Sequence, residues 1–364
     1  MNDTSLRIAR AWLAPCAPLL RGKSALVALS GGADSTALAV ALAALRGELG
    51  LSGLAFGHVD HALRPESGDE ALRAGELARS LGIPFLSERL DPPDRTPDGL
   101  EAWAREARYA ALDRMRERAG CDLTATAHHR MDQAETLTMR LARGTGFAGL
   151  AGIRRLDDRR RLVRPLLEAD PAELRAWLRE LGLRWSEDPS NSDQRIARNA
   201  VRHRILPAWE AREPGAAATL SHVAGLAGEL LPALRAWARR AYPFAPLPGR
   251  RGGPPAPGSE SRPEPPAPGS EPPPALCVPV DPDDLALDDG ALLRLACDEV
   301  WTALGLPAPE SARWDRLMTR ARAGQPFSEQ LGPSAELRLV RLPGPRFLLA
   351  AGNLPAKWPS GEGS

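Results

Sequence analysis

Six residues near the start of the chain, Ser30-Gly31-Gly32-Ala33-Asp34-Ser35, have the residue types of a phosphate-binding loop. Two adjacent glycines let the backbone turn without a Cβ clash, so successive N–H groups can point into one anion-binding hollow at the positive end of the following helix. Ser30 and Ser35 can add hydroxyl donors, and a carboxylate such as Asp34 suits a phosphate site mainly through a divalent cation. The pattern predicts a pyrophosphate-holding loop, with a purely structural turn as the alternative.

Two commoner nucleotide-binding loops are excluded. Gly22-Lys23-Ser24 imitates the end of a Walker A motif, but residue 17 is Ala where that motif needs Gly, and the triplet precedes a strand rather than following one. No G-x-G-x-x-G sequence follows a predicted strand, so a dinucleotide-binding fold has little support.

A second group of chemically capable residues lies around 128–135. His128 and His129 end an apolar run, and Asp132 and Glu135 fall on one face of the helix that follows. Adjacent histidines on an extended chain point to opposite sides, which disfavours a metal ion shared between them. Acidic residues at a helix N-terminus also interact favourably with the helix dipole. This structural role is the alternative to a functional site and would explain either carboxylate alone.

Apolar and amphipathic segments alternate along the first half of the chain and would position these groups. Strands are expected near 24–30, 54–60, 85–90 and 122–128, and helices near 35–49, 67–82, 99–119 and 131–143. This alternation predicts an α/β fold with a parallel sheet, and the loop and the acidic helix both follow strands at the edge where open sheets bind ligands. Further helices are expected at 170–182, 197–206 and 215–241.

Composition bounds the class of protein. The chain has 364 residues and is 43% hydrophobic, enough for two domains with real cores. Its four cysteines are dispersed without a C-x-x-C pair, which argues against a zinc ribbon, an iron–sulfur site or a disulfide framework and fits a reducing, cytoplasmic location. We expect no export signal and no membrane span, because no run approaches about 18 apolar residues.

Charge is distributed unevenly. The net charge is only +1, but residues 140–204 hold 15 Arg and 9 Asp or Glu, so a nucleic-acid partner is compatible with this segment. Lys23 and Lys357 are the only lysines in the sequence, so no lysine within the motifs can act as a base or a Schiff-base nucleophile.

The chain divides by composition into five parts. Residues 1–210 form the expected catalytic domain and 211–242 a helical connector. Residues 243–280 are rich in Pro and Gly and are expected to form a disordered linker. Residues 281–352 are expected to form a small α+β domain, and 353–364 a flexible tail.

These motifs together resemble the bacterial tRNA(Ile)-lysidine synthases, a family of the N-type ATP pyrophosphatase (PP-loop) group. The resemblance implies an adenine nucleotide alpha hydrolase-like sheet with helices on both faces. It covers roughly residues 20–210 and is weaker over 281–350, where the family has a substrate-binding domain. The motifs that carry it are Ser30–Ser35, His58–Arg64, Glu101-x3-Arg105-x2-Arg108-Tyr109, Ala127–Gly144, Arg164–Leu167, Trp185–Asp188, Asn191 and Arg198-Asn199-x2-Arg202.

The resemblance implies that the enzyme transfers AMP from ATP to C2 of the wobble cytidine of a CAU-anticodon tRNA(Ile), after which L-lysine displaces the AMP. ATP would be bound by Ser30, Gly31, Gly32, Ala33, Asp34 and Ser35, with Arg143 and Gly144, and Mg²⁺ would be held through Asp34. Asp34, Arg105, Asp132 and Glu135 are the implied catalytic residues, and the last two would hold lysine. A structural ion pair competes with the catalytic interpretation of Arg105 and of Arg143.

Clustered positive charge makes further residues candidate contacts to the tRNA backbone. They are the segment 154–164, including Arg164, together with Arg198, Arg202 and Arg204. The sequence leaves open a homodimer and the identity of the base that takes the lysine proton.

One departure from the family pattern stands out: Met131 occupies the position of the first of two consecutive Asp residues, and Asp132 is retained. Two rivals therefore accompany the ligase interpretation. One is a tRNA thiolase built on the same loop, which would normally bring a reactive cysteine to the site. The other is a catalytically silent tRNA-binding protein.

Overall fold

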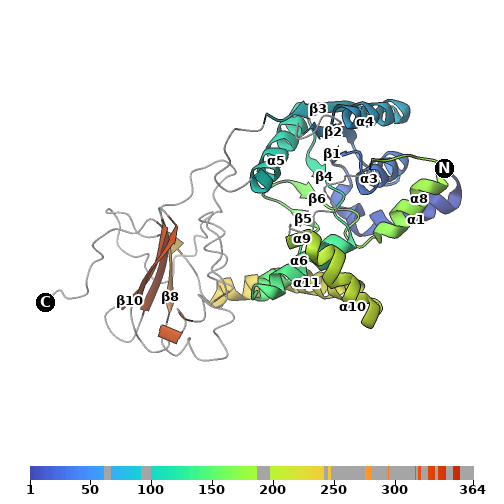
Figure 1. Ribbon diagram of the computed structural model, residues 1–364. Helices are drawn as coiled ribbons and strands as arrows, with labels where there is room; N and C mark the ends of the chain where they lie inside the picture. Colours follow the sequence, from blue (N-terminus) through green and yellow to red (C-terminus); the bar gives the residue numbers. More distant parts are fainter. Residues whose placement is uncertain are drawn as a thin grey trace. The chain divides into compact units, whose positions relative to one another are not determined.

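A mostly parallel, six-stranded sheet carries the motif-bearing half of the chain (Figure 1). Its strands run in the order β3-β2-β1-β4-β6-β5, and every neighbouring pair is parallel except β5 and β6. The strand order reverses direction between β1 and β4, which is where open α/β sheets bind ligands. The strands are β1 (Ser24–Ala28), β2 (Gly53–Asp60), β3 (Phe85–Arg89), β4 (Leu123–Ala125), β5 (Leu156–Asp157) and β6 (Leu162–Val163).

The computed structural model describes residues 1–60, 67–91, 100–186, 197–241, 245–246, 275–280, 294, 316, 319–320, 327–332, 335–341 and 347–352. The chain divides into two units, residues 1–139 with 152–224, and residues 140–151 with 225–364. The sheet above belongs to the first unit.

Both faces of this sheet are covered by helices, as the sequence predicts. Successive residues of β1 point to opposite faces, so Val27 joins a core with α3 (Ala33–Leu45) and α8 (Pro171–Glu180). Its neighbour Leu26 packs with Leu112 and Met115 of α5 (Leu100–Arg118). Figure 1 shows α3 and α8 on one side of β1 and α5 on the other. α4 (Ser67–Leu81) contributes Ala74 and Ala78 to the first of these cores.

The N-terminal helix α1 (Asp3–Leu13) belongs to the same core and has no counterpart in the sequence-based prediction. Asn2 caps it by accepting a hydrogen bond from the Ser5 amide. Trp12 meets Trp177 of α8 edge-on, with ring centroids 5.3 Å apart, and Trp177 Nε1 donates to Ser5 O at 3.0 Å. The two tryptophans therefore hold α1 to α8.

Two more of the described helical segments follow the predicted pattern, whereas four short ones were not predicted. α6 (Arg130–Ala142) follows β4. The predicted helix 197–206 is α9 (Ala197–Ala200) followed by a π-helical turn, η3 (Val201–Ile205). The shorter elements are η1 (Ala14–Cys16), α2 (Ala17–Leu20), α7 (Phe147–Leu150) and α10 (Leu206–Arg212).

α11 (Ala216–Ala241) is the longest described helix and fits the prediction for 215–241. Over Ala216–Arg240 it is long and apolar enough to cross a membrane by length and composition alone, a test that core helices of soluble proteins also pass. The expectation that no segment approaches this length and apolarity was therefore too strong.

The second unit contains an antiparallel five-stranded sheet in the order β7-β8-β11-β10-β9. Two of its strands, β7 (Ala245–Pro246) and β8 (Ala275–Val280), fall within the predicted linker 243–280, which is therefore too long at both ends. The apolar residues Leu276, Cys277, Val278 and Val280 explain strand formation, although Pro279 lies inside the strand. The other strands are β9 (Phe327–Gly332), β10 (Ala335–Arg341) and β11 (Phe347–Gly352). Residues 247–274 and the tail 353–364 lie outside the described residues.

Candidate functional site

The glycine-serine loop leaves the carboxyl end of β1 and enters α3 directly. Gly31 has φ +89°, a left-handed conformation that favours glycine, and Gly32 caps the helix. The Ser30 amide donates to Ser35 Oγ at 3.2 Å, and Ser35 Oγ donates to Gly32 O at 3.0 Å. Both serine hydroxyls therefore lie together at the N-terminus of α3, where backbone N–H groups favour an anion.

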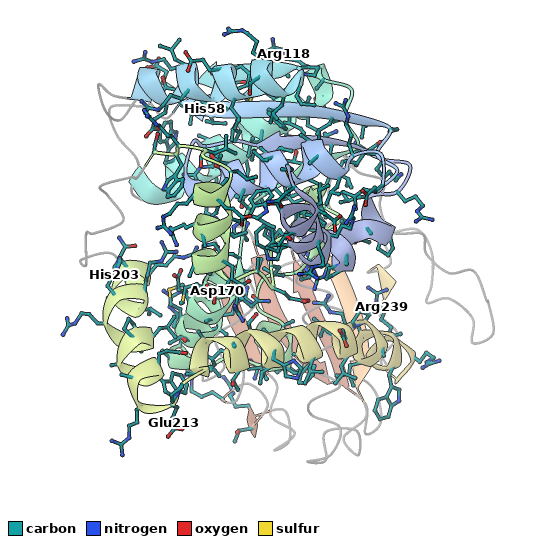
Figure 2. All side chains as sticks on the ribbon, turned by 90° about the vertical axis from the view of Figure 1, so that its right-hand side faces the viewer. His58, Arg118, Asp170, His203, Glu213 and Arg239 are labelled. Atoms are coloured by element: carbon teal, nitrogen blue, oxygen red, sulfur yellow. The ribbon has the colours of Figure 1, made fainter. Side chains whose placement is uncertain are left out.

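His58, which Figure 2 labels on β2, supports the start of this loop. Its side chain is 2% exposed, and its Nδ1 lies 2.8 Å from Leu29 O. This contact fixes the residue that precedes Ser30. His61–Arg64, the rest of that sequence motif, lies outside the described residues.

Asp34 stands in the first turn of α3 with one carboxylate oxygen available for a cation. Its Oδ1 is buried and has no hydrogen-bond partner in the described structure, while Oδ2 lies 3.4 Å from Nε2 of His129. Oxygen ligands suit Mg²⁺, and the neighbouring loop suits phosphate. Within the described ranges no three His, Cys, Asp or Glu side chains gather to form a metal site, so an ion at Asp34 would need phosphate oxygens and water as its other ligands.

The N-terminus of α6 lies beside this loop and is tied to it through His129. The His129 amide donates to Asp132 Oδ2 at 3.0 Å, which caps the helix, and His129 Nδ1 is 3.4 Å from the same oxygen. His129 thus contacts Asp34 with one ring nitrogen and Asp132 with the other. The loop carboxylate and the helix carboxylate are linked by one imidazole.

Two arginines from α9 and η3 complete the site. Arg198 donates through Nε to Glu135 Oε2 at 2.6 Å and through Nη2 to Asp132 Oδ1 at 2.7 Å. Arg202 donates to Glu135 through Nε and, at 3.1 Å, through Nη2, and its Nη2 is also 3.3 Å from Asp132 Oδ1. The Glu135 side chain is 0% exposed. We call Asp132, Glu135, Arg198 and Arg202 the four-charge cluster.

The electrostatics of the site keep Asp132 ionised. Burial opposes ionisation, but the charges of His129, His128 and Arg198 outweigh it and lower the pKa of the Asp132 carboxyl. Burial likewise opposes protonation of His129, yet the hydrogen bond to Asp34 and the charges of Asp132 and Asp34 raise the pKa of its imidazole.

Comparison with known proteins places this site in a family. The model of the PP-loop domain matches residues 5–209, more than half of the chain. The chain belongs to the PP-loop family. The match covers the loop, both histidines and the whole four-charge cluster.

Two curated relatives are named tRNA(Ile)-lysidine synthase. The protein from Nitratidesulfovibrio vulgaris is 44% identical over 199 residues, which cover 54% of this chain and 57% of the relative. The protein from Deinococcus radiodurans is 41% identical over 250 residues, which cover 68% of this chain and 40% of the relative. The chain thus spans about half the length of these relatives.

A solved structure is similar in fold alone. The U34-tRNA thiolase NcsA from Methanococcus maripaludis, with its [4Fe-4S] cluster, superposes with a TM-score of 0.52 at 19% identity, over 62% of this chain and 78% of that one. This likeness supports the PP-loop architecture of the first unit.

The loop residues and the two predicted carboxylates come together as expected, but three of the predicted arginines contact other groups of the protein. Arg198 and Arg202, expected to contact the tRNA backbone, pair with the carboxylates, and since their side chains are 29% and 28% exposed the tRNA contact stays a prediction. Arg164 is 7% exposed, and its Nη1 donates to Arg154 O at 2.6 Å, so its guanidinium is engaged in the interior and unsuited to a phosphate contact. Arg204 is exposed, as a backbone contact requires.

Arg105 lies on the exposed face of α5, 5.2 Å from the centre of the Tyr109 ring. The side chain of Glu101, its predicted ion-pair partner, lies outside the described residues. Arg143 and Gly144 belong to the second unit, so their proximity to the loop stays a prediction.

Sequence reasoning missed two features of this site. The bridging role of His129 depends on a strand end meeting a distant loop. The pairing of Arg198 and Arg202 with Asp132 and Glu135 had a detectable signal, because an i,i+4 pair of arginines matches an i,i+3 pair of carboxylates on facing helices.

His128 makes a testable contribution to acid stability. Burial lowers the pKa of its imidazole to about 4 from 6.5, partly offset by Asp132. Between these values the unfolded chain binds a proton that the folded chain does not, so stability rises with pH across this window and is lost as pH falls through it. At the low end the loss from this group is about 3 kcal/mol.

Urea unfolding at a series of pH values, compared between the wild type and His128→Asn, measures this effect. The variant should lose part of the pH dependence between about 6.5 and about 4. Parallel curves for the two proteins would contradict the depressed pKa of His128.

Proposed function

We propose that this chain is a tRNA(Ile)-lysidine synthase, a ligase that uses ATP to join L-lysine to C2 of the wobble cytidine in a CAU anticodon. In the first step the C2 oxygen attacks the α-phosphate and pyrophosphate leaves. In the second the ε-amine of lysine attacks C2, the C–O bond to AMP breaks, and the amine loses a proton. AMP and lysidine are the products.

In the first step the loop Ser30–Ser35 binds the pyrophosphate part of ATP. Its two serine hydroxyls already lie together at the N-terminus of α3, and on binding the Ser35 hydroxyl would exchange its hydrogen bond to Gly32 O for one to a phosphate oxygen. Asp34 would hold Mg²⁺ through its unpartnered Oδ1. That ion supplies charge neutralisation for the departing pyrophosphate.

The observation that carries the proposal is the link from Asp34 through His129 to Asp132. It joins a phosphate-binding loop to a buried carboxylate pair through one side chain. A nucleotide site alone would need no second, buried pair of carboxylates beside it. A reaction in which a cationic amine attacks an adenylated carbon needs both the phosphate-binding loop and the carboxylate pair.

The charge balance of the four-charge cluster suits an amine that must become a nucleophile. Two arginines already neutralise Asp132 and Glu135, so an arriving ammonium gains less than it would from two unpaired carboxylates. A free lysine amine has a pKa of about 10.4 and must lose a proton before it attacks. A balanced cluster lowers the cost of that loss relative to an acidic pocket.

Exposed arginines extend the proposal to the tRNA. Arg159, Arg160 and Arg161 lie on the turn before β6 and are exposed, as is Arg204 on η3. Clustered guanidinium groups of this kind bind a phosphate backbone. We assign the selection of tRNA(Ile) to the second unit, including residues 281–352.

The two cysteines whose side chains the structure describes give no support to the thiolase rival. In the part of the chain that the structure describes, Cys16 and Cys121 are buried free thiols, and burial raises the pKa of each. A sulfur-transfer cysteine needs a lowered pKa. The silent-binder rival rests on Met131 alone, while Asp132 and Glu135 are both present and ionically paired.

Incubation with ATP, Mg²⁺, radiolabelled lysine and CAU-bearing tRNA(Ile) tests the proposal. We expect lysine to enter the tRNA with stoichiometric release of AMP and pyrophosphate. Tight tRNA binding without incorporation would favour the silent binder, and ATP-dependent sulfur incorporation would favour the thiolase.

A further inference from the structure

Ser186, in the segment after α8, lies directly on the phosphate-binding loop. Its amide donates to Gly31 O at 2.9 Å. Its Oγ lies 3.8 Å from the position that a Cβ on Gly31 would take, and its carbonyl oxygen lies 3.9 Å from the equivalent position on Gly32. Ser186 therefore packs against both glycines at the point where the loop turns.

An arginine from α4 reaches the same point. Arg73 Nη2 donates to Ser186 Oγ at 3.0 Å, so one hydroxyl group separates its guanidinium from the loop. The side chain of Arg73 is exposed, and Cβ of Glu70, one turn earlier on α4, lies 3.9 Å from the Cβ position on Gly31. Glu70 and Arg73 therefore bring α4 to the loop, Glu70 directly at Gly31 and Arg73 through Ser186.

The loop needs more positive charge than its own residues provide. Lys23 is the only lysine in the described residues and precedes β1, at the opposite end of the strand from the loop. A pyrophosphate brings several negative charges, and Asp34 adds another. A guanidinium can donate to Ser186 and to phosphate oxygens together, because it carries five N–H donors in a planar fork.

We propose that Arg73, held by Ser186, binds the β- and γ-phosphates of ATP and the pyrophosphate that leaves. The inference rests on the proposed function for its ligand and adds a residue that the loop motif does not contain. The alternative is a purely structural role, in which Arg73 pairs with Glu70 at i,i+3 and holds Ser186 in place. The proposal and this alternative predict different results. Only a contact between Arg73 and phosphate makes the affinity for ATP and pyrophosphate, relative to that for AMP, depend on Arg73.

Calorimetric titration of the full chain with MgATP, magnesium pyrophosphate and AMP distinguishes them. Arg73→Ala should weaken ATP and pyrophosphate binding about tenfold, the effect of losing one charge-assisted hydrogen bond at a partly exposed site. AMP binding should stay within about twofold, because AMP lacks these phosphates. Arg73→Lys should lie between the two proteins, since lysine keeps the charge but loses the fork.

Arg79→Ala is the matched control, because it removes the same charge from the last turn of α4. It should leave all three affinities unchanged. Equal effects of Arg73→Ala and Arg79→Ala, or an equal loss for AMP and ATP, would overturn the assignment of Arg73. A wild-type chain that binds neither ATP nor pyrophosphate would instead reject the proposed function, and the role of Arg73 with it.

Discussion

Replacing Asp132 with asparagine should reduce lysine incorporation by about 1000-fold, the scale seen when an ionic group that acts in a transition state is removed. Asparagine keeps an oxygen that can accept from the His129 amide, so the cap of α6 survives. It loses the negative charge that pairs with Arg198 and that the lysine amine would meet. The four-charge cluster becomes net positive and repels an ammonium.

Three control measurements test whether the loss of activity in Asp132→Asn is specific to the lysine step. ATP affinity and tRNA affinity should each stay within about twofold, since Asp132 reaches the loop only through His129 and its described contacts do not include the exposed arginines at 159–161. Asp170→Asn is the matched control: Asp170, labelled in Figure 2, pairs with Arg130 at 2.7 Å on the first turn of the same helix but outside the cluster. Its activity should change little. An unchanged rate for Asp132→Asn would remove Asp132 from the mechanism.

The parts of the site that lie close in sequence could be predicted from it. The loop Ser30–Ser35 is defined by a strand, two glycines and a helix start, all local features, and its structure follows them. The helix carrying Asp132 and Glu135 was predicted within a residue at each end, because its apolar face has the helical period.

What could not be predicted depends on distant contacts. Arg198 meets Glu135 across a separation of 63 residues, so the clustered positive charge gave no indication that part of it balances buried carboxylates. The burial of Arg164 could not be predicted either, since a count of charges cannot distinguish an exposed guanidinium from one buried against Arg154 O. Strand β8 was missed because prolines on either side outweighed a short apolar run in the composition.

Removing Glu135 should cost the first unit about 3 to 5 kcal/mol, the range for breaking a buried ion pair from one side. Glu135→Ala leaves Arg198 and Arg202 with only the Asp132 carboxylate, in a place where Glu135 itself was 0% exposed. The melting temperature should fall by about 10 °C, given about 2 to 4 °C per kcal/mol for a unit of this size. Differential scanning fluorimetry and urea unfolding measure the loss.

Glu48→Ala is the matched control, because Glu48 pairs with Arg10 at 2.7 Å on the surface, where both side chains are about half exposed. Solvent screens that pair, so its loss should lower the free energy of unfolding far less than the loss of Glu135 does. The double variant Glu135→Leu, Arg202→Leu should recover much of the stability lost in Glu135→Ala, since an apolar pair needs no charge compensation. It should recover no lysine incorporation, because one of the two carboxylates proposed to hold lysine is gone. Equal costs for Glu135→Ala and Glu48→Ala would mean that the four-charge cluster is open to water, and would weaken the case that it controls the protonation of a bound amine.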